Sequence, residues 1–600
     1  MKLSFAAVAV TLTLFSAASF ALTLGTYHAS YPGINGKVPV SVSFSKDKIL
    51  SITVDGSKET PGIGQTAAST LPKKIVEAQS LGVDGVSGAS ITSKAIFDGV
   101  ADCIRQAGGD PAAFRKKAVA KPHAKAQSAV QKVNTDLVIV GGGAAGMIAA
   151  INGADHGLKV TLLEKMPFLG GSSAICGGSV IVTGSKLQRD LGEKTDTPAK
   201  LAYDLLYNGH QKNDLNALTF YADNVGKSID WIMSKGVQFT DKFSFRAEFQ
   251  VPRMVPLKGG CPRYAQTLRD LVAKEKNVRV MLNTRASEII MKNGHAVGIR
   301  AKTTDGTPVV VNGRAVLLAT GGFGNNKSML AGDLKNALYY GPVSSTGDGH
   351  QMAEKIGADL QLMDYGKVYP QGIQVAPGLA KSTLQGNIGA YDEAGILVNS
   401  KGLRVVNEKG SGIQMMDVML KEPSKTLYLA LDPKSYEGFH RLIGRNGVSQ
   451  QELDQWFAAN GTKEPIFIHA KSLEEACRIA GIDAANLRQT IKKYNSYVKS
   501  GNDPEFHRQP KFMKKTIDDS GDFYIIEQKP RFATTLGGVK VTTSMEVLNK
   551  KGDVIPGLYA AGEVANSVHG DDSTPGGNLS FGITTGKTVS DVIAAKLGKK

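Results

Sequence analysis

The spacing of apolar and polar residues divides this chain into stretches that predict different secondary structures. In "VPVSVSFSKDKILSITVD" apolar residues take every second position, which predicts two strands joined by a turn at 45–48. Helical patterns follow at 72–80 and 90–107. From position 135, "TDLVIVGGGAAGMIAAINGADHGLKVTLLEK" predicts a buried strand, a glycine turn, a helix and a second strand. We therefore expect a small α+β domain followed by a larger α/β domain.

A stretch without a sustained apolar stripe separates the two predicted domains. Residues 113–133 are rich in Ala and Lys and are predicted to form an exposed linker, which leaves 22–112 as the small N-terminal domain. A chain of 600 residues is too long for one core, so several domains are expected.

The first 21 residues have the pattern of a secretory signal peptide. Lys2 is followed by an apolar run at 6–15 and by a small-x-small cleavage site that ends at Ala21. A membrane anchor is the alternative, but this run is shorter than the ~20 residues that span a bilayer. No later segment is apolar enough to span, so we expect a periplasmic protein cleaved near Ala21.

The charge and the cysteines narrow the function only a little. The formal net charge of +17 is compatible with nucleic acid, but an exported chain has little access to it. A basic surface that meets acidic proteins or anionic substrates is the alternative. The four cysteines form no tight disulfide framework, and no C-x-x-C-H haem motif or metal-binding Cys/His cluster occurs.

A dinucleotide-binding fingerprint gives the first chemical assignment. Gly141, Gly143 and Gly146 match G-x-G-x-x-G between a strand and a helix, and Glu164 ends the next strand. Glycines there let the backbone approach a pyrophosphate at the helix N-terminus, and the carboxylate accepts hydrogen bonds from a ribose. A glycine turn that only packs helix on strand is the alternative. The fingerprint alone does not separate NAD from FAD.

Three further stretches favour FAD. "LGGSSAICGG" at 169–178 follows Glu164 and is suited to lie along a long cofactor. "AVLLATGGFGNN" at 315–326 is a strand that ends in a glycine turn. Near the C-terminus, Gly562-Glu563 is followed by "GGNLSFGITTG", whose helix N-terminus would stabilise a reduced, anionic flavin ring.

These stretches, in this order, resemble the flavoproteins that include fumarate reductase, urocanate reductase and 3-ketosteroid dehydrogenase. "GPVSSTGDGHQMAEKIGADL" and "GILVNSKGLRVVNE" add similarity to the soluble bacterial fumarate reductases. The resemblance implies a Rossmann-type FAD-binding domain at 134–359 and 531–600, with an α+β capping domain inserted at 360–530. It also implies non-covalent FAD and a role in anaerobic electron transport. The expected FAD contacts are Gly141, Gly143, Ala145, Gly146, Glu164, Lys165, Gly171, Ser172, Gly321, Gly322, Gly349, Gly562, Glu563, Asn578 and Ser580.

The small N-terminal domain carries a second motif. "DGVSGASITS" at 84–93 resembles the D-x-x-S/T-G-A-T/S motif of small FMN-binding domains, in which an FMN phosphate is joined to the last hydroxyl. The corresponding residue is Ser90, where Thr is usual. A serine-rich N-cap is the alternative. Covalent FMN implies an FMN-attaching enzyme and a route for electrons from an external donor such as a periplasmic cytochrome.

The substrate-binding residues of the fumarate reductases are not kept. The resemblance places their proton-donating Arg at Gly412 and two carboxylate-clamping residues at Thr534 and Thr574. A further His and the Arg of the proton relay correspond to Tyr369 and Tyr391. Every charged position is therefore replaced, which favours a neutral or singly charged substrate.

The remaining candidates for catalysis are Tyr369 and Tyr391 as proton donors and Arg531 and Arg404 as cations. For each, a packed tyrosine or a solvated arginine is an equally good interpretation. We expect an enzyme that transfers hydride from FAD to a carbon–carbon double bond conjugated to a carbonyl. A ketosteroid-type dehydrogenase and an electron-transfer flavoprotein without a small-molecule substrate are the alternatives.

Overall fold

A computed structural model describes residues 22–34, 36–60, 62–86, 88–115, 129–246 and 248–599. The expected signal peptide and most of the expected linker lie outside these residues. The chain divides after residue 126 into two compact units, and each is described by itself. The prediction of a mixed α/β fold with a separate small N-terminal domain is confirmed. Among the described residues, no helix combines the length and apolar character needed to cross a membrane.

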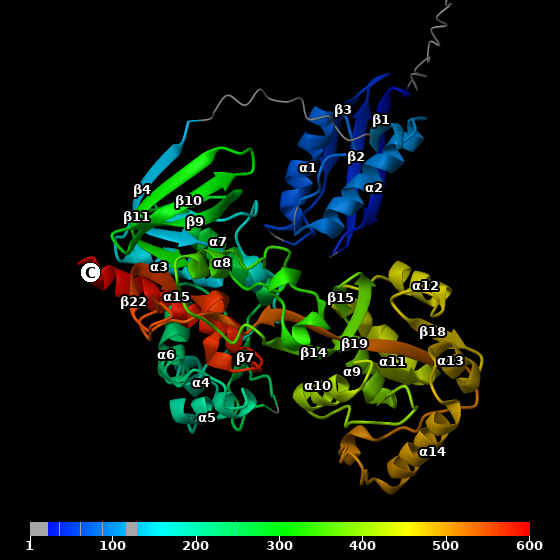
Figure 1. Ribbon diagram of the computed structural model, residues 1–600. Helices are drawn as coiled ribbons and strands as arrows, with labels where there is room; N and C mark the ends of the chain where they lie inside the picture. The colour runs from blue at the N-terminus through cyan, green and yellow to red at the C-terminus, as the bar shows by residue number, and fades with distance from the viewer. Residues whose placement is uncertain are drawn as a thin grey trace, which may run out of the picture. The chain divides into compact units, whose positions relative to one another are not determined.

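The first unit is an antiparallel sheet with two helices (Figure 1). The strands β1 (Gly25–Pro32), β2 (Lys37–Phe44) and β3 (Ile49–Val54) pair in that order. The helices are α1 (Gly64–Ala78) and α2 (Ser90–Gln106). Val38, Val40, Val42 and Phe44 are buried while the residues between them are not, so the alternation in β2 reflects one covered face. Sequence patterning missed β1, and it began α1 near Pro72, which lies inside the helix.

The main sheet of the second unit has the strand order β21–β22–β11–β4–β5–β8, extended by β10 and β9. The pairings from β22 to β8 are parallel. The last four residues of β4 are all buried, as expected for a central strand covered on both faces. The strands are β4 (Gln131–Val140), β5 (Val160–Leu163), β8 (Val278–Met281), β9 (Thr284–Lys292), β10 (His295–Thr303), β11 (Pro308–Leu318), β21 (Glu546–Leu548) and β22 (Val554–Ala560).

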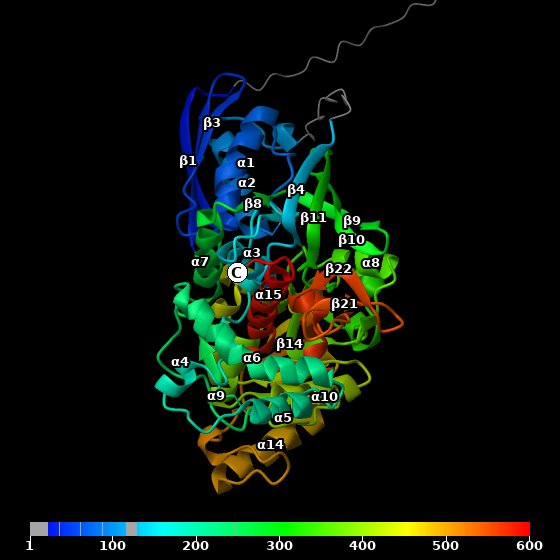
Figure 2. The ribbon, with the colours of Figure 1, turned by 90° about the vertical axis from the view of Figure 1, so that its left-hand side faces the viewer.

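Two helices from opposite ends of this unit lie side by side beneath the sheet. These are α3 (Ala144–Asp155) and α15 (Gly577–Lys596), as Figures 1 and 2 show. A Cβ atom on Gly586 would lie 2.5 Å from the carbonyl oxygen of Ala145, so the two backbones touch at a glycine. The other helices are α4 (Lys186–Asp190), α5 (Pro198–Asn208), α6 (Leu215–Ser234), α7 (Gly260–Lys274) and α8 (Asp348–Lys355), and short strands are β6 (Ser179–Ile181), β7 (Met254–Pro256), β13 (Leu360–Gln361) and β20 (Gly538–Val539).

A second sheet, with order β12–β15–β14–β19–β17–β16 and β18 against β19, forms the capping region. Its long strand β19 (Phe523–Thr535) pairs with β17 and β18 in its first half and with β14 and β12 in its second. The other strands are β12 (Leu338–Tyr339), β14 (Gly366–Ala376), β15 (Leu379–Ser382), β16 (Ile396–Val398), β17 (Leu427–Leu431) and β18 (Phe467–Ala470). The helices are α9 (Leu384–Glu393), α10 (Gly412–Lys421), α11 (Pro433–Ile443), α12 (Gln450–Ala459), α13 (Leu473–Ala480) and α14 (Ala484–Ser500).

Candidate active site

The turn between β4 and α3 is shaped to receive an anion. Gly141 has a φ of +107°, and a Cβ there would lie 2.3 Å from the carbonyl oxygen of Ala319. The Cβ position of Gly143 has no atom within 4 Å, so this residue faces open space. The first turn of α3 contains no acidic residue, and the positive end of the helix dipole there attracts negative charge. The residues present therefore fit the pyrophosphate of a dinucleotide.

Glu164 ends β5 beside this turn and is buried. One carboxylate oxygen accepts from the backbone N–H of Gly142 at 2.7 Å, and the other accepts from Met166 N–H at 2.8 Å. Burial raises the pKa of Glu164, and these two N–H groups act in the opposite direction. The N–H groups hold the carboxylate at the cavity wall, where its remaining lone pairs can accept from a ribose.

A long cavity follows from this turn to the N-terminus of α15. It contains about 1100 Å³ of empty space, part of it open to solvent. The expected FAD contacts that line it are Gly141, Gly143, Ala145, Glu164, Lys165, Gly171, Ser172, Gly321, Gly562, Glu563 and Asn578. The fingerprint, the second glycine loop and the C-terminal stretch thus meet in one place.

Four expected FAD contacts are not in the lining and pack behind it. A Cβ on Gly146 would lie 2.0 Å from the Gly141 carbonyl oxygen, so this glycine lets α3 approach the turn. Added Cβ atoms would also collide behind the wall at Gly322 and Gly349. The Ser580 hydroxyl lies 2.6 Å from the Tyr221 hydroxyl inside the core. These positions shape the cavity without lining it.

The lining also contains residues that motif reasoning missed. Asp348 accepts from Lys165 at 2.9 Å and from Arg285 at 2.8 Å, so it fixes the lysine at the cavity. The signal was present in the "STGDGH" stretch, where the acid begins α8. Cys176, also in the lining, forms a disulfide with Cys261 at the start of α7. No sequence spacing predicted that bridge, because 85 residues separate the partners.

The end of the cavity formed by β19 and α15 is polar but nearly free of charge. Thr534 of β19 lines it together with Glu563. Glu563 accepts from Thr535 N–H at 3.0 Å, and burial raises its pKa to about 7 despite this bond. Asn578, Leu579 and Gly582 place the first turns of α15 in the wall. A helix N-terminus here favours negative charge on a bound ring.

Arg531 and Tyr369 are not in the cavity lining but lie together as cross-strand partners on β19 and β14, with Arg531 three residues before the lining Thr534. The Arg531 guanidinium carbon is 4.3 Å from the ring centre of Tyr340 and 4.9 Å from that of Tyr369. Its Nε donates to the Gln371 carbonyl at 2.7 Å. Although Arg531 is only 3% exposed, no carboxylate in the described part of the chain forms an ion pair with it. Burial raises the pKa of the Tyr369 hydroxyl, which stays protonated at neutral pH.

A lysine that the sequence analysis passed over stands beside them. Lys367 is directly opposite the cavity-lining Thr534 in the β14–β19 ladder, and its side chain is 7% exposed. Its ammonium pairs with Asp572 and lies 5.3 Å from the centre of the Tyr369 ring. Burial and the charge of Lys367 lower the pKa of the nearby, fully buried His569 to about 3. The visible signal was the polar "GK" of "GKVYPQG" inside a buried strand.

Comparison with known proteins agrees with this geometry. The family described as FAD binding domain matches residues 136–579, and the FMN-binding domain family matches 33–105. The chain is 30% identical to the urocanate reductase of Eggerthella lenta, over 89% of this chain and 86% of that protein. It is 32% identical to a fumarate reductase (cytochrome) of Shewanella frigidimarina, over 80% of this chain and 81% of the relative. The chain belongs to the fumarate and urocanate reductase family of flavoproteins.

It is an FAD-dependent oxidoreductase of this type, with one FAD-binding and one FMN-binding domain. It is also 31% identical to the NADH:acrylate oxidoreductase of Vibrio harveyi over 95% of this chain, but it spans only 61% of that relative's length. Among solved structures, the open form of a flavocytochrome c3 fumarate reductase matches with a TM-score of 0.62 and 26% identity, covering 77% of this chain and 78% of that one.

The residue expected to carry FMN in this flavoprotein is exposed. Ser90 is the first residue of α2, and the cap position before it, Ala89, makes no side-chain hydrogen bond. The Ser90 hydroxyl has no hydrogen-bond partner among the described residues, whereas Thr92 bonds Glu59 and Ser93 accepts from Val86 N–H. The serine-rich segment therefore does not form a conventional N-cap at Ser90.

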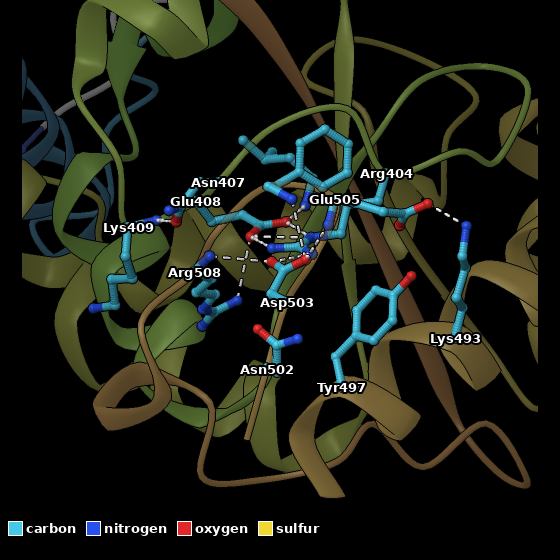
Figure 3. A network of polar contacts seen from close by, with 12 residues as sticks. Arg404, Asn407, Glu408, Lys409, Lys493, Tyr497, Asn502, Asp503, Glu505 and Arg508 are labelled. Carbon is cyan, nitrogen blue, oxygen red and sulfur yellow. Dashed lines mark hydrogen bonds and ion pairs between the residues drawn. The ribbon is translucent and has the colours of Figure 1, made fainter. Parts of the chain in front are cut away.

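Two of the four expected catalytic residues lie instead in the interior of the capping region. Figure 3 shows Arg404 within a network where it pairs with Glu408 and with Asp503, both at 2.8 Å. Tyr391 is buried in α9, and its carbonyl accepts from Arg508, which also pairs with Glu408. Neither lines the cavity. The charges of Arg404 are satisfied within the cap, so the expectation that it serves catalysis gains no support.

Uncharged residues occupy the positions that correspond to the charged substrate-binding residues of the fumarate reductases. Gly412 begins α10, and a side chain there would meet nothing within 4 Å. Thr574 is buried with its hydroxyl unpartnered among the described groups, next to His569. Thr534 lines the cavity. In this flavoprotein, Arg531 and Lys367 are the buried cations of that region.

Proposed function

We propose that this flavoprotein is an exported reductase of monocarboxylic enoates or related carbonyl-conjugated alkenes, with electrons entering through FMN joined to Ser90. FAD, when bound in the cavity, supplies the hydride for one carbon of the double bond. The names of the relatives, acrylate oxidoreductase and urocanate reductase, support this class of substrate. The observation that carries the proposal is Arg531, which among the buried arginines of the described residues is the one without an acidic partner.

Arg531 is suited to hold one carboxylate. A buried cation without a partner is strongly unfavourable, so the two terminal nitrogens of Arg531 favour the binding of an anion. Its guanidinium plane is held by two aromatic rings and by the Gln371 carbonyl, which preorganises it for a bidentate bond. Lys367, by contrast, already has Asp572 as its partner. One available cation matches one carboxylate and leaves fumarate's second carboxylate without a clamp.

Tyr369 is suited to supply the proton. Its hydroxyl stays protonated because burial raises its pKa. Arg531 and Lys367 flank its ring and stabilise the phenolate that forms when the proton leaves. The proton goes to the carbon beside the carbonyl, while the hydride goes to the other alkene carbon.

The substrate proposal is tested by oxidation of a reduced viologen dye with a panel of acceptors. Acrylate and cinnamate should be reduced, and fumarate should be slower on the order of a hundredfold, the usual cost of one missing preorganised charged contact. Fumarate turnover equal to that of a dedicated fumarate reductase would show that the anchor is misplaced. Turnover of a steroid enone alone would favour the ketosteroid alternative, and turnover of no acceptor would favour an electron carrier.

FMN attachment is proposed from the exposed, unpartnered Ser90 hydroxyl at the start of α2, where a helix N-terminus stabilises a phosphate. Denatured protein should keep FMN fluorescence on the polypeptide and release FAD. The Ser90→Ala variant should lose the bound fluorescence, while Ser69→Ala, an exposed hydroxyl on α1, should keep it. Retention of fluorescence by Ser90→Ala would place the attachment elsewhere.

Export is proposed from the sequence of residues 1–21, which lie outside the described residues. The disulfide between Cys176 and Cys261 supports it, because such bonds persist in oxidising compartments. An FMN-attaching enzyme and a donor such as a periplasmic cytochrome are the partners that follow. The test is cell fractionation with N-terminal sequencing, which should find mature protein in the periplasm beginning after Ala21. Intact Met1 in the cytoplasm would contradict export.

A further inference from the structure

The buried Lys367–Asp572 pair continues outward to the protein surface. Asp571 lies next to Asp572 in the chain, and its oxygens meet His210 Nδ1 at 2.7 Å and Lys212 Nζ at 2.8 Å. His210 is 49% exposed, Asp571 and Asp572 are each 16% exposed, and Lys367 is 7% exposed. The side chains are thus most exposed at His210 and least exposed at Lys367. We call His210, Asp571, Asp572 and Lys367 the inlet chain.

The two loops that carry His210 and the two aspartates are pressed together at their glycines. A Cβ on Gly570, whose φ is +67°, would lie 2.3 Å from the Gly209 carbonyl oxygen. A Cβ on Gly209 would lie 2.4 Å from the His569 carbonyl oxygen. His210 itself has a φ of +50°, so the left-handed backbone aims its ring at Asp571. Side chains larger than hydrogen at either glycine would separate His210 from Asp571.

The inner end of the inlet chain reaches the proposed proton donor. Lys367 is the cross-strand partner of cavity-lining Thr534, and its ammonium lies over the Tyr369 ring. Burial raises the pKa of Asp572, while the charges of Lys367 and His210 act against this rise. The other ionisable groups facing this region are Tyr365, Tyr340, Arg531, Glu248 and His569.

We propose that the inlet chain resupplies the proton that Tyr369 loses in each turnover, an inference that rests on the proposed reductase function. Each reduction consumes one hydride and one proton. After Tyr369 gives its O–H proton to the substrate carbon, Lys367 protonates the phenolate and becomes a neutral amine. His210, held by Asp571, takes a proton from water and passes it to the Asp572 carboxylate, and Asp572 passes it on to the neutral Lys367 amine, so that both groups return to their starting charges. The net change is one proton removed from solvent, and no electron moves along the inlet chain.

A purely structural role would have the same ion pairs, so the test needs a matched site. Asp522 in the capping region holds His469 at 2.9 Å and Lys471 at 3.1 Å, the same set of partners that Asp571 has. Asp522 contacts neither β14 nor the cavity lining by any bond that the structure shows. The Asp522→Asn variant is therefore the control for Asp571→Asn.

The experiment measures reduced-viologen oxidation by the FAD- and FMN-loaded enzyme with acrylate and cinnamate as probes, in H₂O and D₂O. His210→Ala and Asp571→Asn should lower kcat by about 10- to 100-fold, with KM unchanged and a larger solvent isotope effect, because proton supply becomes limiting. Added imidazole should restore the His210→Ala rate. Asp522→Asn should match the native enzyme. Flavin reduction by the dye without substrate should be unchanged in all variants.

Three results distinguish a failure of the proposed reductase function from a failure of the proposed proton supply. A native enzyme that reduces neither probe overturns the proposed function and the inlet chain with it. Native turnover together with unchanged kcat in both His210→Ala and Asp571→Asn overturns the inlet chain alone. A loss of kcat without a larger isotope effect and without imidazole rescue, or an equal loss in Asp522→Asn, shows that the ion pairs only hold the loops together.

Discussion

Two buried arginine sites in the second unit differ in one respect. In the capping region, Arg404 and Arg508 are enclosed with Glu408 and Asp503, so each positive charge has a carboxylate partner. At the flavin end of β19, Arg531 is equally buried but has two aromatic rings and one carbonyl as neighbours. Burial of a charge is tolerable only when the charge is compensated. The cap cluster is compensated within the protein, and Arg531 is left to be compensated by a ligand.

The largest effect should come from Arg531→Gln. This change removes the proposed carboxylate anchor, so kcat/KM for acrylate should fall by about 100- to 1000-fold. The folded protein loses an uncompensated charge, and its thermal midpoint should therefore stay equal or rise. Steady-state kinetics and thermal unfolding measure both. Arg531→Lys keeps the charge but not the planar fork, and it should recover only part of the activity. Unchanged kinetics in Arg531→Gln would remove the distinction between the two sites.

The cap cluster should respond in the opposite way to Glu408→Gln. This substitution leaves Arg404 and Arg508 with an uncompensated buried charge and should cost about 3–5 kcal/mol of unfolding free energy. Activity per folded molecule should stay within about twofold, since the network lies away from the cavity lining. Urea denaturation and kinetics at low temperature give the two values. Glu474→Gln, which breaks an exposed pair with Arg488, should cost no more than about 1 kcal/mol.

Glu164 is the acidic counterpart of Arg531, because no ion pair among the described residues reaches it. Glu164→Ala should weaken FAD binding by about 1.5–3 kcal/mol, the worth of a charge-assisted hydrogen bond. That corresponds to about a 10- to 100-fold higher Kd, measurable by fluorescence titration of the deflavinated protein. Glu164→Gln keeps one acceptor oxygen, so its FAD affinity should lie between those of the native protein and Glu164→Ala. Equal FAD affinity in all three proteins would contradict the role of Glu164 in ribose binding.

The smallest effect concerns two buried neutral histidines. Burial lowers the pKa of His350 to about 4, and burial with the charge of Lys367 lowers that of His569 to about 3. Since both folded-state values lie below the ordinary 6.5, stability is full above pH 6.5 and is lost as pH falls toward 4 and 3. Between pH 6.5 and pH 5 the loss should reach up to about 2 kcal/mol for each histidine. The unfolding free energy of the cofactor-free protein, measured by urea denaturation, should depend less on pH across this range in His350→Gln than in the native protein.

The two arginine sites also mark how far the sequence alone could lead. The fingerprint from Gly141 to Glu164 was recoverable because local spacing dictates its strand–turn–helix geometry. Arg531 and Arg404 could not be told apart, since each arginine lies in a mixed polar and apolar stretch. Glu408 lies only four residues after Arg404, but the second carboxylate of that site, Asp503, lies 99 positions away, and nothing in the sequence shows that Arg531 has no carboxylate partner. Long-range partners of this kind leave no periodic signal.

The same limit explains why Lys367 and its partners were missed. Lys367 meets Asp572 across 205 positions, and Asp571 meets His210 across 361. A single "GK" or "DD" in a sequence is most often a solvated surface pair. Only the pairing of β14 with β19 and the contact between the two glycine loops convert them into one cluster.

Because β19 extends from the capping region to the wall of the cavity, the absorption of a bound flavin would be sensitive to movement of the cap. This strand of 13 residues extends about 40 Å, with its first half in the cap's interior ladder and its last residues in the wall of the cavity. A hydrogen-bonded strand transmits a tilt along its length instead of absorbing it locally. A movement of the cap on ligand entry would therefore displace Thr534 and change the surroundings of the chromophore. Visible absorption of the bound cofactor would then follow cap motion in real time, without an attached dye.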